Sequence, residues 1–119
     1  MPRWARYPFE IWIAPNRRTS NIFELSQNEQ KDLAELMLDA SKSLDKVFDD
    51  PMPYTLAWQL SPKGYENSYH FHVCFQPIRR SKTKLKYLAG VEQITGFFLV
   101  DLPPERSARI LRGEELPDE

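Results

Sequence analysis

The chain has 119 residues, 41% of them hydrophobic and 28% charged, as expected for a single globular domain spanning residues 1–119 with one core. Its 16 lysines and arginines nearly balance 17 acidic residues, and the resulting net charge of −1 argues against a nucleic-acid-binding protein. The single cysteine excludes an intrachain disulfide, no apolar run is long enough for a membrane span, and residues 1–10 show no apolar signal-peptide segment, so we expect a cytoplasmic protein.

The first predicted element is a strand over residues 7–14. Its hydrophobic residues alternate with Glu10 and Trp12, and this period of two is typical of a strand with one buried face. Pro8 and Pro15 lie near its two ends, where a missing backbone N–H is tolerated.

A long helix follows. Ser26 and Glu29 have the spacing of a capping box, which marks a helix start. Residues 49–51, Asp-Asp-Pro, end the helix. Between these signals a hydrophobic stripe recurs at helical spacing and is expected to lie in the core: Leu33, Leu36, Met37, Ala40, Leu44, Val47 and Phe48.

Two further strands are predicted at residues 54–60 and 69–76, with a turn or hairpin loop at 61–68. The second of them alternates strictly, so its aromatic and aliphatic residues lie on one face. The other face carries the polar set His70, His72, Cys74 and Gln76.

Both histidines of the chain therefore project from one side of a predicted strand, with Cα atoms roughly 7 Å apart. Two imidazoles so placed can bind a metal with ligands from elsewhere, hold a phosphate, or act as a nucleophile and its partner. They can equally be two half-exposed residues hydrogen-bonded to neighbours. Cys74 on the same face is either a soft third ligand or a buried thiol without a role.

The C-terminal third begins with a basic run, Arg79 to Lys86, which suits phosphate or forms a solvated face. Residues 95–100 are hydrophobic and predict either a strand or a buried helix. Prolines in the first turn predict a short helix from 103 to about 112, and the acidic residues 114–119 are expected to fray. The strand–helix–strand–strand order gives an α+β fold.

Three segments then carry a family resemblance: Arg6–Pro15 (RYPFEIWIAP), Tyr69–Pro77 (YHFHVCFQP) and Arg80–Glu92 (RSKTKLKYLAGVE). In this order they resemble the C-terminal half of galactose-1-phosphate uridylyltransferase, a member of the histidine-triad superfamily, from about Ala5 to Arg112. The resemblance implies an antiparallel sheet with one long helix packed on it and a short C-terminal helix.

The resemblance also implies an activity. The family exchanges uridylyl between UDP-glucose and a hexose 1-phosphate, and a histidine in a His-Pro-His-x-Gln motif of the N-terminal half becomes uridylylated. The present sequence has no His-Pro-His. The chain alone is therefore expected to be inactive, and its partner is either a separate N-terminal catalytic half or further copies of itself in a homo-oligomer.

Two sites follow from the same resemblance. His70 and His72 match two of the four ligands of a zinc or iron site, whereas Gln59 stands where a third histidine is found and the fourth ligand, a glutamate, belongs to the absent half. The segment containing Lys86, Tyr87, Val91 and Glu92 resembles one that contacts the UDP-hexose of the partner subunit in a dimer, although Val91 replaces a tyrosine and the usual later glutamine is not evident near Phe98.

Two other functions remain open from the sequence. The chain can be a non-catalytic nucleotide-binding or assembly module that uses the same sheet and basic run. It can also be an autonomous histidine-triad hydrolase in which His72 is the nucleophile, with Cys74 at the position of the third histidine of the motif.

Overall fold

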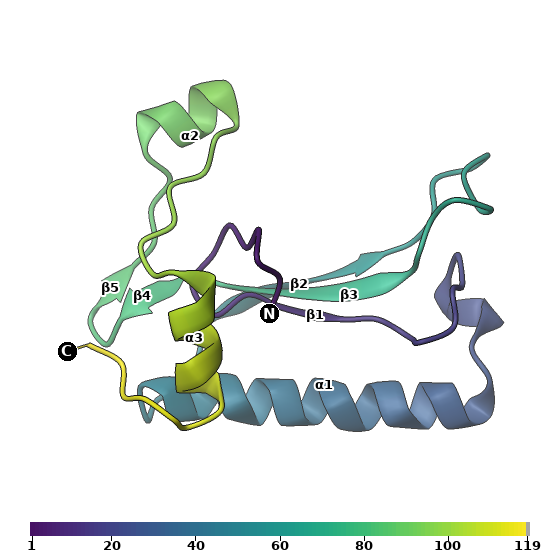
Figure 1. Ribbon diagram of the computed structural model, residues 1–119, viewed down its shortest axis with the longest axis horizontal. Coiled ribbons are helices and arrows are strands. Elements are labelled where there is room, and N and C mark those ends of the chain that lie inside the picture. Colours follow the sequence, from purple (N-terminus) through teal and green to yellow (C-terminus); the bar gives the residue numbers. More distant parts are fainter. Residues whose placement is uncertain (119) are drawn as a thin grey trace.

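A three-stranded antiparallel sheet covered on one face by a long helix forms the body of the molecule (Figure 1). The structure is a computed structural model that describes residues 1–118, apart from the side chain of Ile94. The sheet has the order β1-β3-β2, with bounds β1 Ile11–Ile13, β2 Tyr54–Gln59 and β3 His72–Pro77. The remaining elements are η1 Ile22–Glu24, α1 Gln27–Val47, β4 Arg79–Ser81, β5 Lys84–Leu85, α2 Gly90–Thr95 and α3 Pro104–Leu111. This arrangement confirms the predicted α+β class.

Helix α1 begins and ends where local sequence signals place it. The Ser26 hydroxyl accepts a hydrogen bond from the backbone N–H of Glu29 at 3.3 Å, and the Glu29 carboxylate accepts one from the backbone N–H of Ser26 at 2.8 Å. These two bonds form the predicted capping box. At the other end Asp49 takes a φ of 51°, so the helix cannot continue.

The core lies between α1 and the sheet. Leu33, Ala40, Leu44 and Val47 of the predicted stripe are buried, but Leu36 is 52% exposed and was wrongly assigned to the core. Leu36 instead lies at the edge of the helix face, where it lines a groove together with the residues of β1 and Ala108 of α3. Among the described residues no helix is long and apolar enough to cross a membrane.

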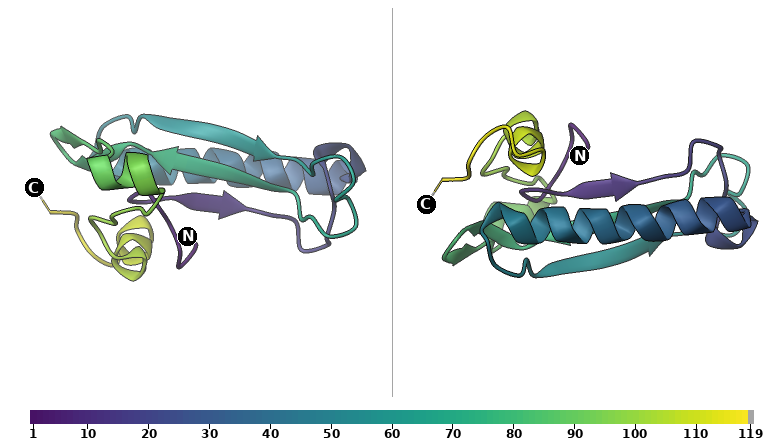
Figure 2. Two further views of the ribbon diagram at one scale, coloured as in Figure 1. Left: turned by 90° about the horizontal axis from the view of Figure 1, so that it is seen from above. Right: turned by 90° about the horizontal axis from the view of Figure 1, so that it is seen from below.

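Strand register separates the two faces of the sheet. Phe75 pairs with Ile11 and Leu56, and all three pack in the core against α1. The next residue toward the start of β3, Cys74, pairs with Trp12 and Ala57 on the opposite face. Figure 2 shows α1 along one face only, so the face that carries Cys74 and His72 points away from it.

All three predicted strands are longer than the strands of the structure; β2 ends only one residue early, at Gln59, and the other two differ more. Phe9 has a φ of 60°, which interrupts the extended backbone, so β1 starts at Ile11 rather than at residue 7. Strand β3 starts at His72 rather than at residue 69, since the amide of Phe71 donates to the carbonyl of Thr19 at 2.7 Å instead of joining the ladder with β2.

The C-terminal part differs more from the prediction. The 95–100 run is neither a strand nor a buried helix: α2 ends at Thr95, Gly96 takes the left-handed conformation with φ 73°, and Phe97 is 77% exposed. Helix α3 confirms the short helix predicted after the prolines. The acidic tail does not fray throughout, because Arg106 forms ion pairs with Glu115 and Asp118; residue 119 lies outside the described residues.

The helix cap gives a testable acid response. The Arg17 guanidinium, followed by the amide of Ser26, lowers the pKa of Glu29 from 4.5 to about 2. Because the pKa is lowered in the folded state, the stabilisation is complete above pH 4.5 and is lost as the pH falls toward 2. We therefore expect Glu29→Gln to lower the urea midpoint above pH 4.5 and to make the midpoint less sensitive to acid below it.

Glu35→Gln is the matched control for this prediction. Glu35 lies on the same helix, exposed, with its carboxylate 4.0 Å from the ammonium of Lys31, and such surface pairs contribute little. If the urea midpoint of Glu29→Gln falls with acid as much as that of the unsubstituted chain, the Glu29 carboxylate does not stabilise the fold through the cap.

Candidate functional site

The sheet face that points away from α1 carries the first candidate site. His72 and Gln59 are opposite each other in the β2–β3 register, and Cys74 and Trp12 are opposite each other in the β1–β3 register. Side chains two residues apart on a strand share a face. The structure thus places His72 and Cys74 on one face, as the alternation predicted, and the strand register adds Gln59 to that face.

The His72 ring is held by aromatic neighbours. It stacks on Trp12 with centroids 4.5 Å apart and planes 20° apart, and Tyr69 lies 6.0 Å away on a nearly parallel plane. Its Nδ1 lies 2.9 Å from the backbone carbonyl of His70. With Nδ1 engaged, Nε2 is the nitrogen that can bind a metal or a phosphate.

His70 lies just before β3, not within it. Its Nε2 is 2.8 Å from the carbonyl oxygen of Pro15, which joins the end of the β1 segment to the start of β3. Both imidazoles therefore make a hydrogen bond to a backbone carbonyl, the arrangement that orients a histidine ring. The expectation that both histidines lie within one regular strand was wrong, whereas their roles as ligands stay a prediction.

Glu10 is a buried residue of this face that the sequence analysis did not single out. It is 2% exposed, and its carboxylate accepts from the Trp12 indole N–H at 2.6 Å and from the amides of Arg6 and Tyr7 at 2.9 and 3.2 Å. Glu10 thereby fixes the indole on which His72 stacks. The strand alternation, which puts Glu10 and Trp12 on one side, was the signal that could have found this pair.

The donor set of this face does not form a complete metal site within the chain. Among the described residues no three histidine, cysteine or acidic side chains gather in one place. Burial, with a smaller effect of the Glu10 carboxylate, raises the pKa of Cys74 to about 11, so its thiol is neutral in the metal-free chain. His72 thus lies opposite Gln59, whose amide is a weak ligand, and His70 lies just before β3 with its ring at the Pro15 carbonyl.

The basic run makes several ion pairs within the chain. Arg79 lies 2.5 Å from Asp50 and Arg80 lies 3.5 Å from Asp101. These pairs neutralise part of the positive charge that the sequence offers for phosphate. The run is therefore less free to bind an anion than its composition suggests.

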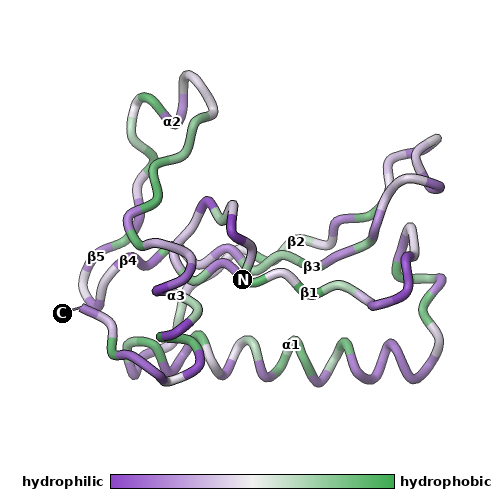
Figure 3. Tube along the Cα trace, viewed as in Figure 1, coloured by the Kyte–Doolittle hydropathy of each residue, from purple (hydrophilic) through white to green (hydrophobic). Residues whose placement is uncertain are grey.

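The second candidate site is an arm, residues 86–101, that extends from the sheet and carries α2 at its tip (Figure 1). Figure 3 shows hydrophobic stretches in both chain segments of the arm. Tyr87 is 81% exposed and Val91 45% exposed. Two of the four predicted UDP-sugar-contacting residues thus lie on the arm surface.

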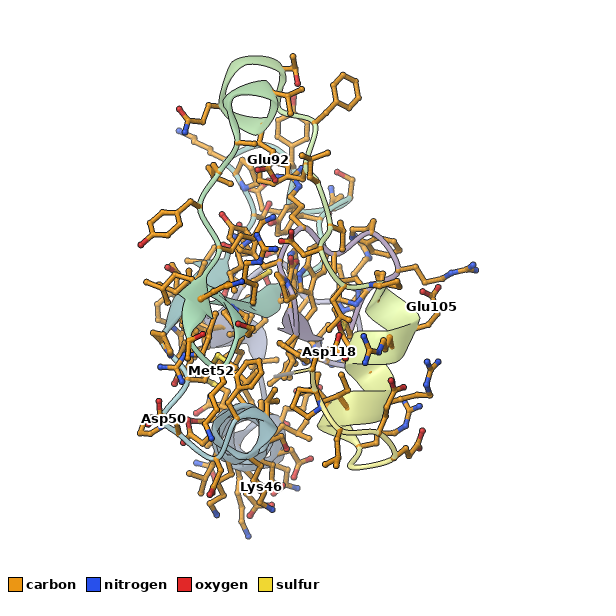
Figure 4. All side chains as sticks on the ribbon, turned by 90° about the vertical axis from the view of Figure 1, so that its left-hand side faces the viewer. Lys46, Asp50, Met52, Glu92, Glu105 and Asp118 are labelled. Carbon is orange, nitrogen blue, oxygen red and sulfur yellow. The ribbon has the colours of Figure 1, made fainter. Side chains whose placement is uncertain are left out.

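The other two, Lys86 and Glu92, are buried and face each other. Their charged ends are 3.2 Å apart. Figure 4 places Glu92 between the two chain segments of the arm. The backbone N–H groups of Ala89 and Leu99, more than the lysine, hold the pKa of Glu92 below its ordinary value of 4.5. Asp101 completes this cluster at 3.4 Å from Lys86, and no sequence signal pointed to it because it is distant along the chain.

Comparisons with known proteins agree on one family. The family model described as galactose-1-phosphate uridyl transferase, C-terminal domain, matches residues 1–119. A galactose-1-phosphate uridylyltransferase of Thermotoga maritima is 37% identical over 98% of this chain, and one of Haemophilus influenzae is 30% identical over 95%. The chain spans only 37% and 33% of these two relatives, about a third of each.

Solved structures give the same result. A structure titled as a uridylyltransferase superposes with a TM-score of 0.87 at 32% identity, covering 95% of this chain and 36% of that one. An ADP-glucose phosphorylase from Arabidopsis thaliana with bound ADP-glucose superposes with a TM-score of 0.79 at 27% identity, covering 97% of this chain and 38% of that one.

Proposed function

Because the chain belongs to the galactose-1-phosphate uridylyltransferase family, as its C-terminal domain, we propose that it serves a UDP-glucose:hexose-1-phosphate uridylyltransferase without carrying the nucleophile. It contributes contacts to a UDP-sugar and a dimer surface. The His-Pro-His motif is absent from the sequence, so the uridylylated histidine belongs to an N-terminal catalytic half outside these 119 residues. A cytoplasmic location stays a prediction.

The observation that carries the proposal is the arm. It holds an aromatic ring, Tyr87, and an aliphatic side chain, Val91, on the surface of a segment that its own buried polar groups keep in shape. An exposed aromatic face stacks well on a base or ribose, and its hydroxyl can hydrogen-bond a sugar. Exposed apolar groups on a protruding segment are also typical of a surface that a partner subunit covers.

The predicted zinc or iron site is part of the same proposal. His70 and His72 supply two ligands, Gln59 stands at the position of the third, and the fourth, a glutamate, comes from the N-terminal half. The metal then joins the two halves rather than taking part in the transfer by this chain. No step of the proposed function depends on it.

The contact residue is tested by Tyr87→Ala. In a mixture of the chain with the N-terminal catalytic part of the Thermotoga maritima relative, this substitution is expected to raise KM for UDP-glucose about 10-fold. That change corresponds to the loss of roughly 1.4 kcal/mol of aromatic contact. Tyr65→Ala, which removes another exposed tyrosine, 63% exposed in the 61–68 loop, should leave KM unchanged.

Equal KM values for the two tyrosine variants would contradict the contact. A chain that binds UDP-glucose in calorimetry and yet adds nothing to transfer by the catalytic part would instead support the non-catalytic nucleotide-binding or assembly module. Hydrolysis of a nucleoside phosphoramidate that His72→Ala abolishes would support the autonomous hydrolase.

A further inference from the structure

The imidazoles of His70 and His72 each have one ring nitrogen at a backbone carbonyl, but not the same nitrogen. In His70 it is Nε2, which lies 2.8 Å from the carbonyl oxygen of Pro15. In His72 it is Nδ1, which lies 2.9 Å from the carbonyl oxygen of His70. The two rings are therefore held by different nitrogens, although they lie only two positions apart in the chain.

These contacts determine which nitrogen of each ring carries the proton. A carbonyl oxygen can only accept a hydrogen bond, so the nitrogen beside it must be the N–H of the ring. A neutral imidazole has one N–H and one lone pair. His70 is therefore the Nε2–H tautomer with its lone pair on Nδ1, and His72 is the Nδ1–H tautomer with its lone pair on Nε2.

Aromatic neighbours hold the His72 ring in this orientation. It stacks on Trp12 with 4.5 Å between the ring centroids, and the Trp12 indole N–H donates to the buried Glu10 carboxylate at 2.6 Å. Tyr69 adds a second, nearly parallel ring at 6.0 Å. A half-turn of the imidazole would put a carbon in place of Nδ1, and the His70 carbonyl would lose this donor.

Histidines that bind metals show the same kind of arrangement. Such a histidine donates one ring N–H to a carbonyl or carboxylate, which fixes the tautomer and directs the lone pair of the other nitrogen to the metal. His70 and His72 both meet this requirement within the chain. The two side chains therefore fit the role of metal ligands that the proposed function gives them.

We propose that the carbonyls of Pro15 and His70 set opposite tautomers in the two histidines, so that a metal ion is bound by Nδ1 of His70 and by Nε2 of His72. The identity of the ligand as a metal ion rests on the proposed function, whereas the two tautomers are a property of the metal-free chain. Side chains that are oriented before binding lose less conformational entropy when the ligand arrives.

The tautomers are tested first, by nitrogen-15 NMR of the 119-residue chain without metal, under conditions where both imidazoles are neutral. His70 is expected to show a protonated Nε2 and an unprotonated Nδ1, and His72 is expected to show the reverse. The variants His70→Gln and His72→Asn assign the two sets of ring signals. The same tautomer in both rings would overturn the proposal.

Amide side chains give an independent test, because each can replace one nitrogen of the ring. The NH2 group of glutamine reaches about as far as Nε2, and that of asparagine about as far as Nδ1. Glutamine at position 70 can keep the bond to the Pro15 carbonyl, so His70→Gln should have a higher urea midpoint than His70→Asn. At position 72 the order should be reversed, with His72→Asn above His72→Gln.

Each pair of variants is its own matched control, since both members lack the imidazole and differ only in where the amide lies. A variant that does not fold counts as the lower midpoint of its pair. The same order at both positions would contradict opposite tautomers. A general loss of stability on removal of a histidine would lower both members of a pair equally and would also contradict the assignment.

The binding nitrogens are tested by adding zinc to the mixture of this chain with the N-terminal catalytic part of the Thermotoga maritima relative. We expect the largest nitrogen-15 shifts at Nδ1 of His70 and Nε2 of His72, while the protons on the other two nitrogens remain. A shift at Nε2 of His70 with loss of its proton would overturn the assignment. If both rings show the expected tautomers but do not respond to zinc, the metal site of the proposed function fails while the tautomers stand.

Discussion

Replacing Phe75 with alanine is expected to lower the free energy of unfolding by about 3–5 kcal/mol, the range for removing a fully buried aromatic ring. Phe75 is 1% exposed and pairs with Ile11 and Leu56 in the middle of the sheet. Its ring also lies 5.0 Å from that of Tyr54. The cavity left by alanine would therefore open between all three strands and α1.

The control is the same substitution at an exposed phenylalanine. Phe97 is 77% exposed on the arm, so Phe97→Ala should change the free energy of unfolding by no more than about 0.5 kcal/mol. Urea denaturation measures both free energies of unfolding. An unchanged m-value shows that the variants and the unsubstituted chain expose similar surface areas on unfolding. Similar losses for Phe75→Ala and Phe97→Ala would contradict the described core.

Elements with local signals were predicted well from the sequence. The capping box at Ser26 and Glu29 determines the start of α1 because both partners lie within one helical turn. Prolines in the first turn similarly gave α3. The alternation of hydrophobic and polar residues in β3 predicted which face of the sheet carries His72. Once one side chain of a strand is known to be buried, the faces of all its other side chains follow.

Features that depend on distant contacts were not predicted. Thr19 accepts the amide of Phe71 and delays the start of β3, and nothing in the local sequence of either residue shows this. The resemblance pointed to Lys86 and Glu92 as ligand contacts. The interior pairing of Lys86 with Asp101, fifteen positions away, becomes visible only when the arm folds back on itself.

The hydrophobic content of residues 95–100 led to the wrong prediction that this run is a strand or a buried helix. A run that includes Phe97 and Leu99 is usually buried, yet both side chains are exposed here. Exposed apolar side chains on a protruding segment are typical of a surface that a partner covers, which is the role we propose for the arm.

The second large effect concerns catalysis. The chain alone is expected to show no uridylyl transfer from UDP-glucose, since it lacks the His-Pro-His motif and loss of the nucleophile lowers kcat by several orders of magnitude. Neither His70 nor His72 lies in such a motif. We therefore expect no uridylylated histidine on this chain.

The most direct measurement is transfer from UDP-glucose to galactose 1-phosphate by the N-terminal catalytic part of the Thermotoga maritima relative, with and without this chain. The chain that carries Tyr65→Ala is the matched positive control, and the chain that carries Tyr87→Ala shows whether the gain depends on the arm. We expect the addition of this chain to raise kcat/KM about 10-fold or more, by supplying the missing contacts to the sugar nucleotide. No gain over the catalytic part alone, or a radiolabelled uridylyl adduct at His72 of this chain, would contradict a C-terminal domain that binds the sugar nucleotide while another half performs the chemistry.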